Sequence, residues 1–390
     1  MQHARQQPPH QQPQRQPGHA APSPQPQYGA HGTNVGMVKC SSVPAIAVMI
    51  AVVVALAAIF AFGAIAYAKG SGGLRSAASS IDSAKTANSM EVMSFNAADI
   101  SSNGDSASSD FAVMPAMLDG SDESDEIVSF SLSDTRAPEL SNKNLSAIRT
   151  ALESFDGASV GFGMFDVKSG RGIGYSLDQE IYGASSFKAP YALYLCQKHV
   201  ENGELTIPGL SDEDETELFG ASGYTKILIE NAICNSDNDS FAMLRSMYDA
   251  GGYNEWVDEL GIQDTAYTPD SWFPWYSVRS SLKIWTEMYN YWQTGGDAAQ
   301  WLSSLCEETT VSFLRDVVDP FGATVRNKAG WCSGSDYGYD FNGVCDAGIV
   351  QLDGRTYVVS VMAGVPDCEE NRELVENLIA AIFDTRDALR

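Results

Sequence analysis

The residues from Val43 to Ala68 form an apolar run without a charged side chain. A helix needs about 20 apolar residues to cross the hydrocarbon core of a bilayer, and this run exceeds that length. The alternative is a cleaved signal peptide, because the run ends in Ala66-Tyr67-Ala68, which is similar to a cleavage site. The apolar core of a signal peptide has only about 7–15 residues. We therefore expect an uncleaved single membrane span at residues 43–68.

The charge differs on the two sides of this run. Residues 1–68 contain no Asp or Glu and carry about +3, whereas the whole chain carries −26, so the part after residue 68 carries about −29. Contacts to phosphate need Lys and Arg, and we therefore expect no nucleic-acid partner. The basic residues that flank the run are nearly balanced and do not fix its orientation.

Cysteine usage favours one orientation. Six of the seven cysteines lie in the C-terminal part, and an even number there is typical of an oxidising exterior. We expect a single-pass protein of the cell membrane, with a short cytoplasmic N-terminus and an extracellular C-terminal domain. The sequence leaves the oligomeric state open.

Composition divides the chain into four parts. Residues 1–38 are rich in Gln and Pro and are predicted to be a disordered tail. The span at 43–68 is followed by a Ser- and Asp-rich segment, 69–136, predicted to be a disordered stalk. Residues 137–390 have the hydrophobic patterning of a globular domain.

The globular part alternates between strand and helix patterns. Apolar residues at helical spacing occur near residues 145–155, two strand-like runs follow at 159–167 and 172–175, and a helical middle covers 187–301. Strand-like runs return at 323–332, 343–352 and 356–363, before a closing helix at 369–389. This order predicts an α+β fold, in which terminal helices pack on one antiparallel five-stranded sheet and an all-helical subdomain is inserted.

The stretch GASSFKAPYALYL places Ser185 three residues before Lys188 at the start of an apolar run. Residues three apart on a helix are neighbours on one face. A serine needs a neighbouring base, which is usually histidine. After the apolar run the only histidine is His199, about 20 Å further along such a helix. A Ser-His-Asp triad at Ser185 is therefore excluded, and we expect neither a metal site nor a cofactor.

Two further motifs follow in order. Ser236-Asp237-Asn238 comes after a helical run, and Lys328-Ala329-Gly330 lies in a strand-like run. Each is weak evidence alone, but the ordered set resembles that of class A β-lactamases and penicillin-binding proteins. The resemblance covers roughly residues 140–390, and it implies a β-lactamase-like fold and an active-site serine hydrolase.

The resemblance implies three catalytic residues. Ser185 would attack an amide carbonyl, and Lys188 would accept its proton directly or through water. Ser236 would relay a proton to the leaving nitrogen. Burial or a second cation would keep Lys188 neutral for part of the time.

The resemblance also implies four substrate-binding residues. Asn238 would hold the amide of the substrate's side chain, and Lys328 would attract the substrate's carboxylate. Gly330 would let the backbone come close, and the N–H groups of Ser185 and Trp331 would form the oxyanion hole. Asp237 is expected to be structural.

The chain departs from the family pattern at two places. Ala329 stands where the family has Thr or Ser, and residues 263–276, where the family has a loop glutamate, contain none. Asp264 or Asp270 could substitute only with a shorter side chain. We therefore expect an acyl-enzyme with a β-lactam or a D-Ala-D-Ala-like cell-wall peptide, with deacylation impaired. The alternative is a penicillin-binding sensor that is acylated without turnover, or a wall-binding module.

The cysteines give one specific expectation. Cys332 and Cys345 flank a Gly- and Tyr-rich loop between two predicted strands, which predicts a cross-strand disulfide beside the site. A bridge between Cys196 and Cys234 is rejected, because Cys196 would lie about 16 Å beyond Ser185 by helix rise. The partners of Cys196, Cys234, Cys306 and Cys368 remain open.

Overall fold

The computed structural model describes residues 113–120, 126–209, 221–266 and 273–390. The predicted tail and the predicted membrane span lie outside these residues, as does most of the predicted stalk. Among the helices in the described ranges, none combines the length and the hydropathy that a membrane crossing requires.

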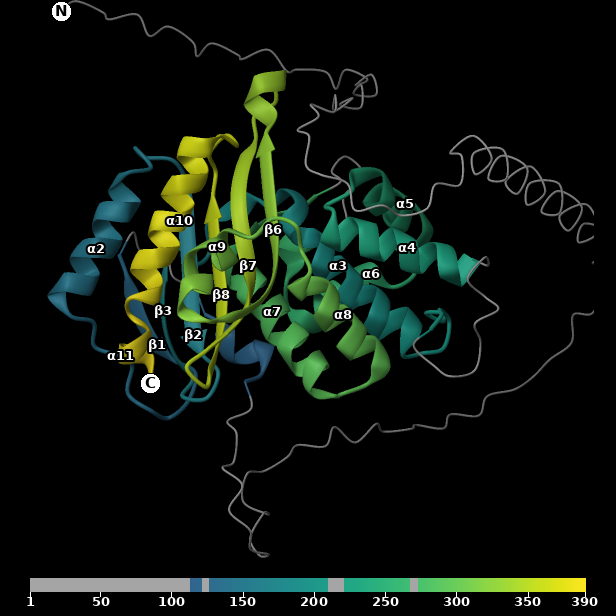
Figure 1. The fold of residues 1–390 in the computed structure, drawn as a ribbon, viewed down its shortest axis with the longest axis horizontal. Coiled ribbons are helices and arrows are strands. Elements are labelled where there is room, and N and C mark those ends of the chain that lie inside the picture. Colours follow the sequence, from purple (N-terminus) through teal and green to yellow (C-terminus); the bar gives the residue numbers. More distant parts are fainter. Residues whose placement is uncertain (1–112, 121–125, 210–220, 267–272) are drawn as a thin grey trace, which may run out of the picture. The chain divides into compact units, whose positions relative to one another are not determined.

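A six-stranded antiparallel sheet is the centre of the fold (Figure 1). Its spatial order is β1-β3-β2-β8-β7-β6, so β1 and β6 are the edge strands. The strands are β1 (Val128–Ser131), β2 (Val160–Asp166), β3 (Arg171–Tyr175), β6 (Thr324–Ser333), β7 (Asn342–Leu352) and β8 (Arg355–Ala363).

Both faces of the sheet are buried, and the sequence of β8 shows why. Successive side chains of a strand point to opposite faces. Val358 and Met362 belong to one core cluster, whereas Val359 and Val361 belong to the other. The turn before β8 is closed by Asp353 and Gly354, which both have positive φ, as the favoured two-residue hairpin turns require.

Helices cover each face of the sheet. The N- and C-terminal helices form the layer on one face, and α7 together with the inserted helical subdomain forms the layer on the other face (Figure 1). The first layer comprises α2 (Asn142–Glu153), α9 (Phe313–Val318), α10 (Glu369–Phe383) and α11 (Arg386–Leu389). The second comprises α3 (Lys188–Leu195), α4 (Ala221–Cys234), α5 (Asn238–Tyr248), α6 (Tyr253–Leu260), α7 (Val278–Gln293) and α8 (Asp297–Glu307).

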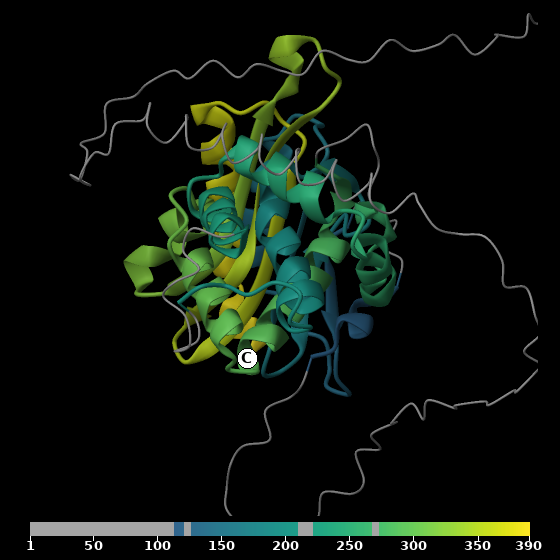
Figure 2. The same ribbon diagram turned by 90° about the vertical axis from the view of Figure 1, so that its right-hand side faces the viewer.

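Shorter turns join these elements. A π-helical turn, η3 (Cys196–Val200), continues α3. The 3₁₀ turns are η1 (Pro115–Leu118), η2 (Ala184–Phe187), η5 (Gln263–Thr265), η6 (Asp319–Phe321) and η7 (Gly334–Tyr337). The β6–β7 connection with η7 extends beyond the helices in both views of the fold (Figures 1 and 2).

The α+β class and the helical insert are confirmed, but the sheet has six strands and not five. The additional strand, β1, pairs with β3 and comes from the predicted stalk range. Its sequence, VSFS, is half-buried and too short to stand out in a Ser-rich stretch. A second, two-stranded sheet was also not predicted; it pairs β4 (Glu180–Tyr182) with β5 (Trp275–Ser277).

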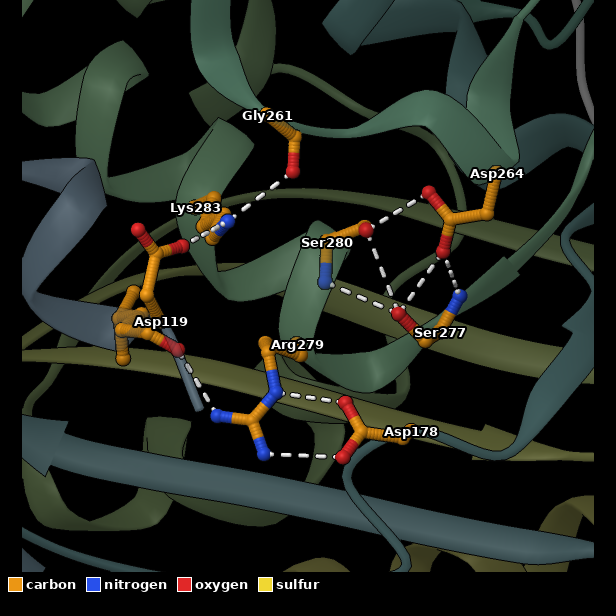
Figure 3. Close-up of polar contacts among 9 residues, drawn as sticks. Asp119, Asp178, Gly261, Asp264, Ser277, Arg279, Ser280 and Lys283 are labelled. Atoms are coloured by element: carbon orange, nitrogen blue, oxygen red, sulfur yellow. Dashed lines mark hydrogen bonds and ion pairs between the residues drawn. The ribbon is translucent and has the colours of Figure 1, made fainter. Parts of the chain in front are cut away.

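The segment 113–120, which precedes β1, docks on α7 (Figure 3). Lys283 donates to Asp119 at 2.5 Å and to the Gly261 carbonyl at 2.9 Å. Arg279 donates to the Leu118 carbonyl at 2.8 Å, and Leu118 itself is buried. The globular part therefore includes residues upstream of position 137.

Candidate active site

Ser185 lies in η2, immediately before α3. The residue is nearly buried, with an exposed fraction of 9%. The preceding residue, Ala184, has a φ of +46°. A non-glycine residue in this region costs on the order of 1–3 kcal/mol and persists only where the surroundings enforce it.

The surroundings of η2 supply that constraint. Ser186 donates to the Gly183 carbonyl at 2.6 Å and shares a hydrogen bond of 2.7 Å with the Tyr276 hydroxyl. A Cβ at Gly183 would lie 2.1 Å from the ring of Tyr276. Only glycine lets this ring pack under the turn, and the ring in turn fixes the backbone on both sides of Ser185.

Lys188 is the first residue of α3 and is 1% exposed. Its Nζ donates to the Ser236 carbonyl at 2.6 Å and to Asn238 Oδ1 at 2.7 Å. A neutral amine has two N–H groups and one lone pair, whereas an ammonium group has three N–H groups and no acceptor. The two acceptors occupy both N–H groups of the neutral form and leave its lone pair for a proton.

Burial is the main cause that lowers the pKa of Lys188 from 10.5 to about 6, and the positive charge of Lys328 lowers it further. The charge of Asp237 acts in the opposite direction. The rings of Phe241 and Phe273 lie 5.8 and 5.5 Å from Nζ. At neutral pH the amine is therefore mostly uncharged, as a base for a serine must be.

The Ser236-Asp237-Asn238 motif turns the chain from α4 into α5. Asp237 is the N-cap of α5, since its Oδ1 accepts from the Ser240 N–H at 2.7 Å, and the expected structural role is confirmed. Ser236 has a φ of +56°, a second strained residue at the site. This backbone turn directs the Ser236 carbonyl to Lys188 and the hydroxyl to Lys328.

Lys328, on β6, is 1% exposed. Its Nζ donates to Ser236 Oγ at 3.1 Å and to the Ala329 carbonyl at 2.6 Å. Burial lowers the pKa of Lys328 to about 8, and the charge of Asp346 is the largest effect that raises it. The structure thus connects the two lysines of the separate motifs through one serine.

Gly330 brings the edge strand against the turn that carries Ser185. A Cβ at this position would lie 2.2 Å from the Ser186 nitrogen, 2.5 Å from the Gly183 oxygen and 2.8 Å from the Ser185 nitrogen. Since these are backbone atoms, no side chain can occupy position 330. The indole of Trp331 lies 5.6 Å from Lys328 Nζ. The structure therefore brings together the predicted site residues from η2, α3, the α4–α5 junction and β6. They are Ser185, Lys188, Ser236, Asn238, Lys328, Gly330 and Trp331.

A polar network behind β6 was not predicted. Asp346, fully buried on β7, accepts from Asn327 Nδ2 at 2.7 Å and from the Leu314 N–H at 2.9 Å. Asn327 Oδ1 accepts from Thr309 at 3.1 Å and from Arg315 at 3.4 Å. The only sign of this network in the sequence is Asn327, which directly precedes the motif residue Lys328. Its partner depends on the β6–β7 register, in which Asp346 is opposite Ala329.

The two substitutes considered for the loop glutamate have different outcomes. Asp264 stabilises the start of α7, where Ser277 is the N-cap. Its Oδ2 accepts from Ser277 N and Oγ at 2.9 and 2.8 Å, and its Oδ1 accepts from Ser280 Oγ at 2.7 Å (Figure 3). Asp270 lies outside the described residues. Ala329 is fully buried in the apolar cluster between the sheet and α10.

The structure corrects the disulfide prediction. All six cysteines of the described residues are thiols, including Cys332 and Cys345. Cys332 is opposite Gly343, and Cys345 is opposite Gly330, so the two cysteines are diagonal neighbours. Diagonal positions lie about 7–8 Å apart, beyond the Cα separation usual for a disulfide. The remaining open pairings, among Cys196, Cys234, Cys306 and Cys368, are likewise not formed.

His199 lies on η3 and contacts Tyr194 and Glu204, at 2.9 Å each. These partners engage both of its ring nitrogens. In the described part of the chain, no group of three His, Cys, Asp or Glu side chains is arranged to hold a metal ion.

The fold and the clustered motifs define a serine hydrolase of the β-lactamase-like class. Residues 144–385 match the beta-lactamase enzyme family, and this chain belongs to it. No curated protein sequence matches the chain.

One solved structure supports the same fold at low sequence identity, and two further structures are also similar to this chain. A beta-lactamase from Chitinophaga pinensis DSM 2588 is 18% identical, with a TM-score of 0.51, over 63% of this chain and 100% of that chain. PBP-A is 20% identical, with a TM-score of 0.49, over 62% of this chain and 96% of that chain. A beta-lactamase from Sphaerobacter thermophilus DSM 20745 is 16% identical, with a TM-score of 0.48, over 62% and 97% of the two chains.

Proposed function

We propose that this chain is a membrane-anchored extracytoplasmic serine hydrolase that forms an acyl-enzyme at Ser185. Its substrate would be a β-lactam or a D-Ala-D-Ala-like cell-wall peptide. The observation that carries the proposal is the hydrogen-bonded cluster of Lys188, Ser236 and Lys328 beside the Ser185 turn. The membrane anchor rests on the apolar run at residues 43–68.

Acylation begins with proton transfer from Ser185 Oγ to the lone pair of Lys188 Nζ. The Oγ–carbon bond forms at the substrate carbonyl, and its oxygen becomes negatively charged. The N–H groups of Ser185 and Trp331 would stabilise that charge. Support comes from the close approach of Gly330 to the Ser185 nitrogen, which places the edge strand β6 against the nucleophile's backbone.

The carbon–nitrogen bond of the substrate then breaks. The leaving nitrogen needs a proton, and Ser236 Oγ would deliver it and would be reprotonated by Lys328 Nζ, 3.1 Å away. The proton that Lys188 accepted from Ser185 would then restore Lys328 to its charged form. Lys328 would also attract the carboxylate of the substrate. Asn238 would bind the amide of the substrate's side chain and keep its hydrogen bond with Lys188.

Deacylation requires a water and a base to activate it. Residues 263–276 contain no glutamate, and both carboxylate oxygens of Asp264 already accept hydrogen bonds at the start of α7. These two observations support a long-lived acyl-enzyme. They also favour the second candidate function, a penicillin-binding sensor that is acylated without turnover.

The test is covalent labelling of the protein by a fluorescent penicillin. Label should appear on the wild type, disappear in Ser185→Ala and persist in Ser304→Ala, a matched change on α8. Intact-mass spectrometry over time then follows the adduct. Steady hydrolysis of a chromogenic cephalosporin supports a hydrolase, whereas a burst without turnover supports the sensor. The absence of any Ser185-dependent adduct would overturn both.

A further inference from the structure

A buried carboxylate lies directly behind the strand that carries Lys328. In the β6–β7 register Asp346 is opposite Ala329, so Asp346 and Lys328 are on opposite faces of the sheet. Asp346 is fully buried, and its hydrogen bonds join it to Asn327, the residue before Lys328.

A buried charge needs partners, because burial without compensation is strongly unfavourable. Asp346 has two direct donors, Asn327 Nδ2 and the Leu314 N–H. Asn327 Oδ1 in turn accepts a hydrogen bond from Arg315, whose guanidinium also donates to the Thr309 carbonyl at 2.8 Å. Within the described ranges, the carboxylate is thus held by hydrogen bonds and not by a direct ion pair.

We propose that Asp346, oriented by Asn327, is a positioning residue that keeps Lys328 cationic during acylation. This inference rests on the proposed function. The amide of Asn327 fixes the carboxylate behind β6, and its negative charge stabilises the ammonium group on the other face. Lys328 then remains able to attract the carboxylate of a substrate.

Other groups face Lys328 from each element packed against it. Lys188 comes from α3, Cys234 from α4 and Cys306 from α8, whereas Asp237, on the α4–α5 turn, acts on Lys188. Burial raises the pKa of Cys234 to about 11 and that of Cys306 still further, so both thiols are neutral near pH 8. Burial also raises the pKa of Asp346, to about 6, and this group is ionised at pH 8.

The test is the pH profile of Ser185 acylation by a fluorescent penicillin, measured on the full chain. The alkaline limb should lie near pH 8 in the wild type. In Asp346→Asn it should move down by on the order of one to two pH units, the size expected for a unit charge roughly 6–12 Å away at an effective dielectric of about 20. The acid limb, which reports Lys188, should not move.

A double variant keeps the network intact and moves the charge. When Asn327→Asp is combined with Asp346→Asn, the amide introduced on β7 can donate to the carboxylate introduced on β6. The oxygen of that amide can accept from the Leu314 N–H, and the second oxygen of the new carboxylate can accept from Thr309 and Arg315. This swap should restore the alkaline limb to pH 8 or above.

Ser360→Ala is the matched control, because Ser360 is buried on the same sheet and donates to Ser281 at 2.9 Å without a charge. It should lower the melting temperature and leave both limbs in place. An unmoved alkaline limb in Asp346→Asn, or an equal shift in Ser360→Ala, would overturn the inference. A wild type that is never acylated would instead refute the proposed function.

Discussion

Lys188 Nζ lies 2.6 Å from the backbone carbonyl of Ser236, a residue 48 positions later in the chain. This contact joins the start of α3 to the turn between α4 and α5. The carbonyl points to the amine because Ser236 has a positive φ. A carbonyl carries no net charge, so it orients the lysine but raises the pKa of the amine less than a carboxylate would.

The acylation rate should depend on pH as a bell-shaped curve with limbs near pH 6 and pH 8. The reactive form of Lys188 is the neutral amine, which predominates above its pKa of about 6, so the rate should fall as the pH drops below that value. Lys328 must stay protonated, and it loses its proton above about pH 8. Stopped-flow labelling between pH 5 and 9 measures both limbs; a flat profile would contradict these assignments.

Lys328→Met should slow acylation by about 10- to 100-fold, as expected for the loss of a hydrogen bond to a charged group worth about 1.5–3 kcal/mol. It should also move the acid limb to higher pH, because the charge of Lys328 helps to lower the pKa of Lys188. The matched change is Arg326→Met on the same strand, where Arg326 pairs with Glu307 at 2.8 Å. An acid limb that moves equally in both variants would contradict the assignment.

Gly330→Ala should abolish labelling, because its Cβ would come within 3 Å of three backbone atoms around Ser185. The edge strand must then move away from the turn, and the proposed oxyanion hole opens with it. Gly296→Ala is the control: its φ is −66°, and the nearest atom to the new Cβ would be 3.8 Å away. Labelling and thermal unfolding of both variants check this; full labelling of Gly330→Ala would disprove it.

Asp264→Ala should lower the free energy of unfolding by about 1–3 kcal/mol, since it removes the acceptor for Ser277 and Ser280 at the start of α7. The lifetime of the acyl-enzyme should not change, because this carboxylate is occupied by its hydrogen bonds with Ser277 and Ser280. Urea unfolding and the time course of intact mass provide the two measurements. A longer-lived adduct in this variant would identify Asp264 as the base for deacylation.

In the native protein, Cys368 should react first with a thiol reagent among the cysteines of the described ranges, because it is exposed. Burial raises the pKa of Cys234 to about 11 and that of Cys345 to about 12, which keeps both in the unreactive thiol form. Cys368→Ser should remove this fast reaction. If Cys345 reacts as fast as Cys368 under native conditions, the site does not have the packing described.

The long strands and the motif residues could be predicted because their signals are local. The predicted run 343–352 corresponds to β7 at Asn342–Leu352, and 356–363 corresponds to β8 at Arg355–Ala363. Nearly continuous runs of apolar residues and the Asp353-Gly354 turn indicate both strands. The ordered motifs likewise indicated the cluster around Lys188, since each lies in or directly beside an element with a recognisable pattern.

The residues that were missed depend on pairing between distant segments. Asn327 and Asp346 meet only because β6 and β7 pair in one register, and a shift of one residue would place them on opposite faces. The same register places Cys332 and Cys345 diagonally and prevents the predicted disulfide. Strands β4 and β5 have three residues each, and 93 positions separate their paired residues Tyr182 and Trp275.

The strand order also determines where mechanical load enters the domain. The chain upstream of the sheet joins it at β1, and four strands separate β1 from β6. At about 4.8 Å per strand, the two edges are roughly 24 Å apart. A pull on the upstream chain would first strain the contacts of η1 with α7 and the β1–β3 ladder. Within the sheet, tension would therefore reach the edge that carries Lys328 and Gly330 only after it has loaded the opposite edge.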